Sequence, residues 1–382
     1  MDTIELLKQL SQTTGISGHE APIRSAILAH WSRYAAETRV DKLGNAIAIK
    51  RGKHPSTARR AHPEQNAVKS TPGGPPMLHW SIGHGQDAPQ RSIMLASHMD
   101  EIGLMVAGIN RGFIRVTHLG GVDPRILLGQ EVIVHGRKDL PGVIASTPPH
   151  LLKPGERDKI IGLEKLWIDV GLSARQVDRL VEIGDLVSIR RTAIDLKGGL
   201  LAGKAFDNRA SVAAVTICLE QLQTLNHAWD VIAVATVQEE TALLGATTAA
   251  FGLSPDVAVV IDTTFGAQDG TPANEAFDVG GGPTIGIGPN MHPRLTQGLR
   301  AAAKRLELAA PLEPMAGSSG TDAWAVQVAG EGIPTGVLGI PIRSMHTPVE
   351  TVSIKDVERA GRLLAEFIAG LDEEFYQGLI DA

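Results

Sequence analysis

The sequence predicts an α/β protein whose chain is interrupted by a small β-rich insert, and three observations carry this prediction. Short continuous apolar runs, typical of buried strands, alternate with helical patterns in the first and last parts of the chain. Short apolar stretches separated by Gly and Pro occupy residues 105–198, as in a small all-β module. Several strand patterns end in an acidic or imidazole side chain, where open α/β sheets place their ligand sites.

The N-terminal residues predict two helices and a hairpin. Residues 2–14 and 21–37 carry helical periodicity, and residues 38–50 alternate like a hairpin whose turn is Leu43-Gly44-Asn45. Residues 51–91, which are rich in Pro and Gly, predict a surface excursion.

The central segment predicts the domain organisation. Apolar runs such as 113–116 and 131–134 alternate there with Gly and Pro. We therefore expect an all-β domain of residues 105–198, inserted into a catalytic α/β domain made of residues 1–104 and 199–382. Near the C-terminus, Ser353 and Asp356 are expected to cap a helix whose inward face carries Val357, Leu363, Leu364 and Phe367.

Composition limits the class of protein. The 382 residues are 43% hydrophobic and 20% charged, which excludes a disordered chain and allows about two domains. A net charge of −6 gives no electrostatic reason to expect nucleic acid or an anionic membrane as a partner. The single cysteine, Cys218, cannot form an intrachain disulfide and is expected to be a buried core thiol. No segment has the pattern of a leader or a membrane span, so the cytoplasm is the expected compartment.

The run SHMDEIG at residues 97–103 is the most informative motif. It follows the apolar residues 93–96, and the period of two in a strand directs His98 and Asp100 to the same side. One of them can bind a metal ion while the other braces it. Alone, such a pair is more often a polar contact in a loop, so the prediction depends on further motifs.

Four other motifs place an acid or imidazole at the edge of an element. Asp207 in KAFDNR precedes a helical pattern, so it is either a ligand or a helix cap. An apolar strand pattern ends in Glu239-Glu240, which is either a solvated strand end or a pair that divides metal binding and proton transfer. A further strand pattern ends in Asp262, and another is followed by the run SMHTPVE, which contains His346.

The combined set of two imidazoles and several carboxylates suits a dinuclear metal site. Two neighbouring divalent ions need a bridging carboxylate and about two further nitrogen or oxygen ligands each, and such donors suit zinc, cobalt or manganese.

The ordered motifs HMDEIG, KAFDNR, QEE, VIDTT, GTDA and SMHTPVE resemble metallopeptidase family forty-two, which comprises tetrahedral, deblocking and glutamyl aminopeptidases of the co-catalytic zinc exopeptidase superfamily. The resemblance extends over nearly the whole chain, because residues 6–18 and 119–125 also look like that family. It implies a mixed-sheet, three-layer α/β/α metallo-exopeptidase domain with an inserted small β-barrel-like domain. The chain departs from the family at residues 241–246, where TALLGA replaces a GLRGA-like segment.

The resemblance also implies a role for each site residue. His98 and Asp262 would hold one ion, Glu240 and His346 would hold the other, and Asp207 would bridge them. The two ions would be zinc or cobalt. Asp100 would orient His98, and Glu239 would act as the general base. Gly320, Thr321 and Asp322 would lie beside the substrate, although a plain loop before a helix is the alternative.

The implied activity is that of a dinuclear aminopeptidase, in which a metal-bound hydroxide hydrolyses the N-terminal residue from a peptide. One alternative is a related metal-dependent amidohydrolase or deacylase that acts on N-acyl amino acids. A glycosidase, which would use two carboxylates without metal, and a metal-free scaffold are the others. The resemblance further implies homodimers that assemble through the insert into a tetrahedral dodecamer.

Overall fold

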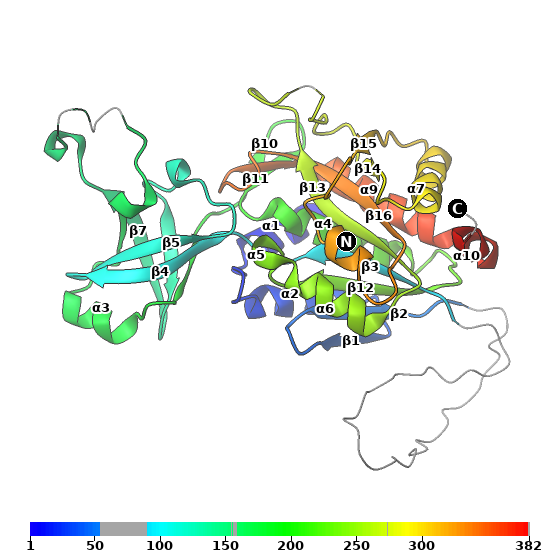
Figure 1. The fold of residues 1–382 in the computed structure, drawn as a ribbon, viewed down its shortest axis with the longest axis horizontal. Helices are drawn as coiled ribbons and strands as arrows, with labels where there is room; N and C mark the ends of the chain where they lie inside the picture. The colour runs from blue at the N-terminus through cyan, green and yellow to red at the C-terminus, as the bar shows by residue number, and fades with distance from the viewer. Residues whose placement is uncertain (54–89, 154, 156–158, 273, 381–382) are drawn as a thin grey trace, which may run out of the picture.

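The computed structural model describes residues 1–53, 90–153, 155, 159–272 and 274–380. Figure 1 shows a large α/β body with a smaller β module beside it. Most of the predicted surface excursion, residues 54–89, lies outside the described residues. No helix among the described residues is both long enough and apolar enough to cross a bilayer.

The α-helices are α1 (Thr3–Gln12), α2 (Ala21–Trp31), α3 (Ala174–Leu180), α4 (Phe206–Gln221), α5 (Glu239–Ala242), α6 (Leu244–Leu253), α7 (Pro293–Arg305), α8 (Ala323–Gln327), α9 (Ile354–Ala369) and α10 (Glu373–Ile380). The strands are β1 (Glu37–Val40), β2 (Ala46–Lys50), β3 (Ser92–His98), β4 (Gly103–Asn110), β5 (Phe113–Leu119), β6 (Glu131–His135), β7 (Asp139–Ser146), β8 (Leu166–Asp169), β9 (Leu186–Ile189), β10 (Ile194–Leu196), β11 (Leu200–Gly203), β12 (Asp230–Thr236), β13 (Val257–Phe265), β14 (Thr284–Ile287), β15 (Leu312–Pro314), β16 (Thr335–Arg343) and β17 (Glu350–Ser353).

A mixed sheet forms the centre of the body. Its strand order is β1-β2-β12-β3-β13-β16-β17-β11-β10, with β14 paired to β16 and β15 paired to β14. The four central strands, β12, β3, β13 and β16, run parallel. They are almost wholly buried along their length, which explains why their sequences are continuous apolar runs instead of alternating patterns.

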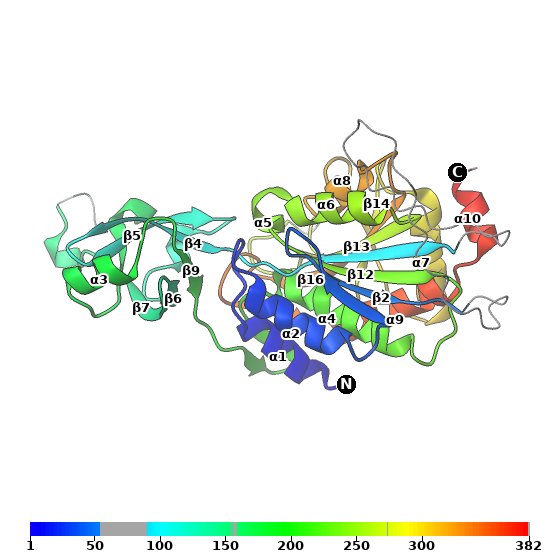
Figure 2. The same ribbon diagram turned by 90° about the horizontal axis from the view of Figure 1, so that it is seen from below.

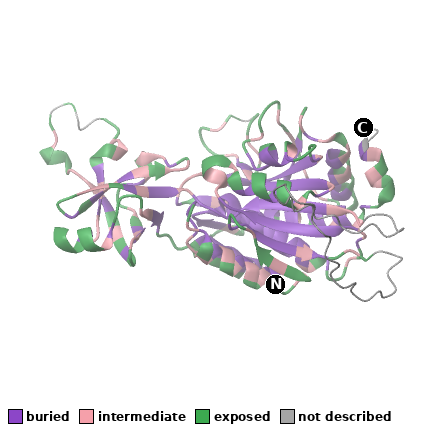
Figure 3. Ribbon diagram, turned by 60° about the horizontal axis from the view of Figure 1, so that its bottom comes forward, coloured by how far each residue is buried: buried purple, intermediate pink, exposed green. Residues whose placement is uncertain are grey.

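Helices cover both faces of this sheet, as Figure 2 shows. Apolar side chains of α1, α2, α4, α7 and α9 form one core with the first face, and those of α6 and α8 form a second core with the other. Figure 3 shows that buried residues are concentrated in the sheet between these layers. The predicted three-layer α/β/α fold is therefore confirmed.

Six strands close into a barrel beside the body, in the order β4-β5-β8-β7-β6-β9. The barrel has its own apolar core, which includes Leu104, Ile114 and Ile168. The predicted β-barrel-like module is thus confirmed, while the domain limits at 105–198 stay a prediction. Strand β10, within that range, pairs with β11 in the large sheet. One contact between barrel and body is the stacking of His19 on His135, with 4.7 Å between ring centroids.

Several local predictions can be compared with the structure. The hairpin is confirmed, because β1 and β2 pair antiparallel. The helix predicted for residues 21–37 ends earlier, at Trp31, because the Tyr34 amide donates to the Trp31 carbonyl in a closing turn. Ser353 occupies the predicted N-cap position of α9, but its side chain makes no cap hydrogen bond, and the capping role predicted for Asp356 is wrong. The Asp356 carboxylate instead accepts the amides of Gly280 and Gly282, which fixes that glycine-rich loop against α9. The predicted inward residues of α9 and the Cys218 thiol are buried.

Candidate metal centre

The predicted ligand residues meet at the carboxyl ends of the parallel strands. His98 is the last residue of β3 and lies directly beside Thr236, the last residue of β12. Asp262 lies near the end of β13, and Glu239 follows β12 by a short left-handed turn at Gln238. Parallel strands bring such positions to one edge of a sheet, which is the physical reason that the sequence could predict this cluster.

Asp207 lies between the two imidazoles. Its Oδ1 is 3.2 Å from His98 Nε2, and its Oδ2 is 3.3 Å from His346 Nε2. Asp262 Oδ1 lies 3.8 Å from the His98 nitrogen, and Glu240 Oε2 lies 3.5 Å from the His346 nitrogen. The five side chains predicted as ligands therefore form one cluster, with Asp207 at its centre.

These separations fit donors that share a metal ion. Two ligands bound at about 2.1 Å with a tetrahedral angle lie roughly 3.4 Å apart. The nitrogen–oxygen distances in the cluster scatter around this value, from 3.2 Å, at the long end of ordinary hydrogen bonds, to 3.8 Å. Two groups of side chains could each hold an ion, namely His98 with Glu239 and Asp262, and His98 with Asp207 and Glu240.

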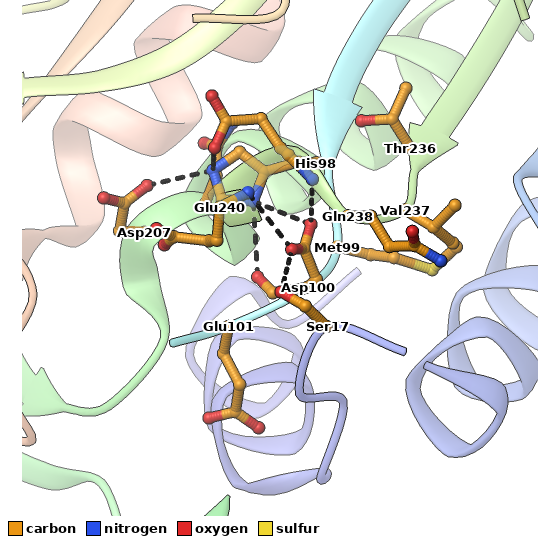
Figure 4. Close-up of polar contacts among 12 residues, drawn as sticks. Ser17, His98, Met99, Asp100, Glu101, Asp207, Thr236, Val237, Gln238 and Glu240 are labelled. Carbon is orange, nitrogen blue, oxygen red and sulfur yellow. Dashed lines mark hydrogen bonds and ion pairs between the residues drawn. The ribbon is translucent and has the colours of Figure 1, made fainter. Parts of the chain in front are cut away.

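Asp100 connects three segments of the site (Figure 4). Its carboxylate lies 3.4 Å from His98 Nδ1 and accepts a hydrogen bond from the Ser17 hydroxyl at 2.5 Å. The same carboxylate accepts the backbone amides of Glu239 and Glu240 at 3.0 and 3.2 Å. The contact with His98 agrees with the orienting role predicted for Asp100, whereas its contacts with the backbone that carries both glutamates were not predicted.

The pKa values of the cluster reflect a surplus of negative charge. Burial is the main cause that raises the pKa of Glu240 and of Asp262 well above the ordinary value, and the charge of Asp207 adds to it. Burial also raises the pKa of Glu239 to about 7, opposed by His98 and assisted by nearby carboxylates. Burial alone would lower the pKa of His98, but the carboxylates, led by Glu239, raise it. Such a cluster is stabilised by added positive charge.

Glu350 is a second buried acid to which the sequence analysis gave no role. It is 2% exposed, and its two carboxylate oxygens accept the amides of Asp207 and His346, each at 3.0 Å. It therefore fixes the backbone of two predicted ligands at once. The available signal for this role was that Glu350 ends the SMHTPVE run, which itself follows a strand pattern.

A buried ion cluster lies behind the metal site. Glu101 contacts the Lys204 ammonium and lies 3.2 Å from a guanidinium nitrogen of Arg209. Arg209 also donates to the carbonyls of Leu10 and Thr13. The charged residues of the HMDEIG and KAFDNR motifs thus tie the two ligand-bearing segments to the end of α1.

A cavity of about 440 Å³ opens onto the metal site. Gly320 and Thr321 line it, as does the neighbouring Ser319. Asp322 is instead 1% exposed and accepts a hydrogen bond from the Thr236 hydroxyl, and burial raises its pKa to about 6. The segment predicted to lie beside the substrate therefore divides into cavity-lining residues and one acid beneath the surface.

A cluster of imidazoles and carboxylates at the strand ends of an α/β/α sheet is typical of metal-dependent hydrolases. The chain belongs to the M42 peptidase family, because the sequence pattern of that family, described as M42 glutamyl aminopeptidase, matches residues 81–363. It is therefore an aminopeptidase, a hydrolase that removes residues from the N-terminus of peptides.

Individual relatives agree with this assignment. A putative aminopeptidase of Acetivibrio thermocellus is 33% identical over 374 residues, which cover 96% of this chain and 98% of the relative. The solved TET aminopeptidase of the marine sediment archaeon Thaumarchaeota archaeon SCGC AB-539-E09 is 30% identical, with a TM-score of 0.85 over 99% of this chain and all of the other. The TET1 peptidase of Pyrococcus horikoshii, which can assemble into a tetrahedron or a large octahedral shell, is 29% identical, with a TM-score of 0.77 over 97% of this chain and all of the other.

Proposed function

We propose that this aminopeptidase uses two divalent metal ions, zinc or cobalt, in the cluster around Asp207. His98 and Asp262 hold one ion, Glu240 and His346 hold the other, and Asp207 bridges them. The observation that carries the proposal is the position of the Asp207 carboxylate, each oxygen of which faces a different imidazole at 3.2 and 3.3 Å. Imidazole and carboxylate donors in this ratio suit zinc and cobalt.

The bound ions would lower the pKa of water and polarise the carbonyl group of the scissile peptide. The protein itself supplies proton transfer through Glu239, whose carboxylate lines the cavity and lies 3.7 Å from His98 Nε2. Glu239 accepts a proton from the attacking water and returns it to the departing amine. Asp100 supports this step by holding the Glu239 amide and the His98 ring in place.

The cavity walls leave room for a peptide whose free N-terminus enters first. We place Gly320 and Thr321 beside the substrate, because they line the same cavity as the ligand cluster. Asp322 is buried beneath the cavity surface, and its negative charge adds to the effect of burial in raising the pKa of Glu239. The N-acyl amidohydrolase alternative is not favoured, because the family assignment is to aminopeptidases.

Metal analysis and substrate assays together test this function. A metal-saturated preparation is expected to contain two ions per chain, to cleave peptides with a free amino terminus, and to lose activity on chelation. N-acylated peptides and β-glucans should be poor substrates. One ion or none in the folded, saturated protein would overturn the dinuclear site, and preference for N-blocked substrates would restore the deacylase alternative.

We further propose that the chain forms homodimers that assemble into a dodecamer through the β module. Large apolar side chains remain exposed on that module, including Ile160 at 74%, Ile183 at 72% and Leu128 at 50%. Exposed apolar groups on a small module support burial against another subunit. The cytoplasm stays the predicted compartment, with no nucleic acid or membrane as a partner.

A further inference from the structure

The cavity contains a carboxylate that the proposed mechanism does not use. Glu313 lies on β15 and lines the cavity together with the metal cluster. Its Oε1 accepts the Thr264 hydroxyl at 2.6 Å, and its Oε2 accepts the Thr284 hydroxyl at 2.5 Å. Each carboxylate oxygen can accept more than one hydrogen bond, so both retain capacity for a further donor. The two hydroxyls therefore fix the carboxylate without neutralising it.

Glu313 has no positive partner within the described part of the chain. Its hydrogen bonds are those from the two neutral threonine hydroxyls, and no Lys or Arg is among the residues that line the cavity. Two divalent ions would offset the four other lining carboxylates, which are Asp207, Glu239, Glu240 and Asp262. The charge of Glu313 would then remain unbalanced.

The sheet sets the distance between Glu313 and the metal cluster. Thr264, which holds Glu313, follows Asp262 by two residues on β13. Both side chains therefore project to the same side, about 6.6 Å apart along the strand. Gly339 lies beside Asp262 in the sheet, and a Cβ atom there would come within 2.8 Å of the Glu313 carboxylate. The glycine thus leaves the space that Glu313 occupies.

Apolar side chains also line the cavity. Phe265, Met315 and Val337 contribute to the wall. A cavity whose lining combines apolar side chains with a carboxylate that has no cationic partner complements a long aliphatic stem that carries a cation, which describes the side chain of lysine or arginine.

We propose that Glu313 selects peptides whose N-terminal residue carries a positively charged side chain. The inference rests on the proposed function, since the metal cluster must fix the scissile bond for Glu313 to meet the side chain of the first residue. Glu313 forms a charge-assisted hydrogen bond with the ammonium or guanidinium group, and its threonine partners hold it in position.

Contact between Glu313 and the free α-amino group is the competing interpretation, and the two make different predictions. Every substrate has an α-amino group, so removal of the charge would then weaken all substrates alike. Recognition of the side chain would weaken lysyl and arginyl substrates far more than leucyl ones.

The first experiment compares kcat/KM for lysyl, arginyl and leucyl substrates in the wild-type protein and in Glu313→Gln. The wild type should favour the basic substrates, and the variant should reduce the lysine-to-leucine ratio of kcat/KM by at least about 10-fold, which is the low end for a hydrogen bond to a charged group. Glu331→Gln is the matched control, because Glu331 is exposed and lies outside the cavity. An equal loss for all three substrates, or a wild-type preference for leucine, would overturn the proposal.

The second experiment needs no variant. Free lysine and norleucine have side chains of similar length but differ in the terminal ammonium group, so lysine should inhibit the wild-type enzyme at a concentration at least about 10-fold lower. Equal inhibition would contradict a role for Glu313 in selecting charge. If leucyl peptides are cleaved without preference for lysine, only this inference fails. If no free-amino peptide is cleaved, the proposed function itself fails.

Discussion

Glu239 and Glu240 are neighbours in sequence with identical side chains, yet they are expected to do different work. Glu239→Gln keeps the shape of the side chain but removes the proton acceptor, so turnover should fall by at least about 10²-fold while metal content stays intact. Glu240→Gln replaces a charged ligand with a weaker neutral one, so it should lose chiefly one ion and regain part of its activity in excess metal. Metal analysis beside steady-state kinetics measures both effects.

The structure gives this comparison a specific alternative. Glu239 Oε2 lies 3.7 Å from His98 Nε2. Glu239, His98 and Asp262 are close enough together to bind one metal ion. If Glu239→Gln loses metal and is rescued by it while Glu240→Gln stays loaded and inactive, the two roles are exchanged. If both variants remain active, the proposed mechanism is wrong.

Asp207 is the one proposed ligand common to both ions. Asp207→Asn should therefore lower the occupancy of both, whereas Asp262→Asn should lower chiefly one. Equilibrium dialysis of each variant against a single metal, followed by metal analysis, measures occupancy independently of activity. Full retention of two ions by Asp207→Asn would show that the carboxylate does not bridge.

The strand-end residues could be predicted because the geometry of parallel strands is regular. His98 and Asp262 end or nearly end apolar runs, and parallel strands bring such ends together. Glu350 could not be assigned a role in the same way. Its contacts with the amides of Asp207 and His346 depend on how the loop after β16 folds back, which no local pattern specifies.

At the scale of elements, the packing of α4 against α9 depends on Gly361. A Cβ atom at Gly361 would lie 2.7 Å from the Ala214 carbonyl oxygen and from Ile217. Gly361→Ala should therefore destabilise the protein by about 1–3 kcal/mol, as overpacking of a core does. Thermal unfolding of the metal-saturated protein measures this effect.

A glycine on another helix provides the control. A Cβ atom at Gly252 in α6 would meet nothing within 4 Å. Gly252→Ala should leave stability unchanged or raise it by up to about 1 kcal/mol, through helix propensity alone. Equal effects of the two substitutions would contradict the packing argument.

Elements with a clear period were easier to predict than their ends. The hairpin of β1 and β2 and the inward face of α9 follow from alternation and helical spacing. The end of α2 could not be predicted from its periodicity. The apolar spacing continues beyond Trp31, but the chain forms a turn there that ends the helix. The contact of Asp356 with the loop at Gly280 was also missed. The amide that this carboxylate accepts lies far away in the sequence, and local sequence alone indicates only a helix cap.

At the scale of the molecule, the β module is the expected site of self-association. Light scattering at micromolar concentration and neutral pH should give a species larger than a monomer. A monomer would refute the association, and a dimer alone would refute only the dodecamer. In an enclosed assembly, short peptides should be cleaved while folded proteins of the same N-terminal sequence are spared.

The division of the chain into the body and the barrel could be predicted, because the pattern of apolar residues changes along the chain. Apolar runs that are buried on both faces gave way to short stretches broken by Gly and Pro, and the structure forms a sheet from the first and a barrel from the second. The assignment of β10 to the large sheet could not be predicted, because a strand of three exposed residues, Ile194–Leu196, carries no pattern that says which sheet it joins.

The contacts of Asp100 have a consequence for how the protein moves. The amide hydrogens of Glu239 and Glu240 point into the Asp100 carboxylate, which is 0% exposed. The same carboxylate accepts the hydroxyl of Ser17, which lies 83 residues before Asp100 in the chain. Exchange of these two hydrogens with solvent deuterium therefore requires separation of segments that are far apart in the sequence, so the first turn of α5, whose amides would ordinarily exchange quickly, should be protected nearly as strongly as the central strands. Hydrogen–deuterium exchange measured by mass spectrometry should show this protection, and Asp100→Ala should remove it locally. Fast exchange in the wild-type protein would mean that the catalytic peptide opens independently of the core.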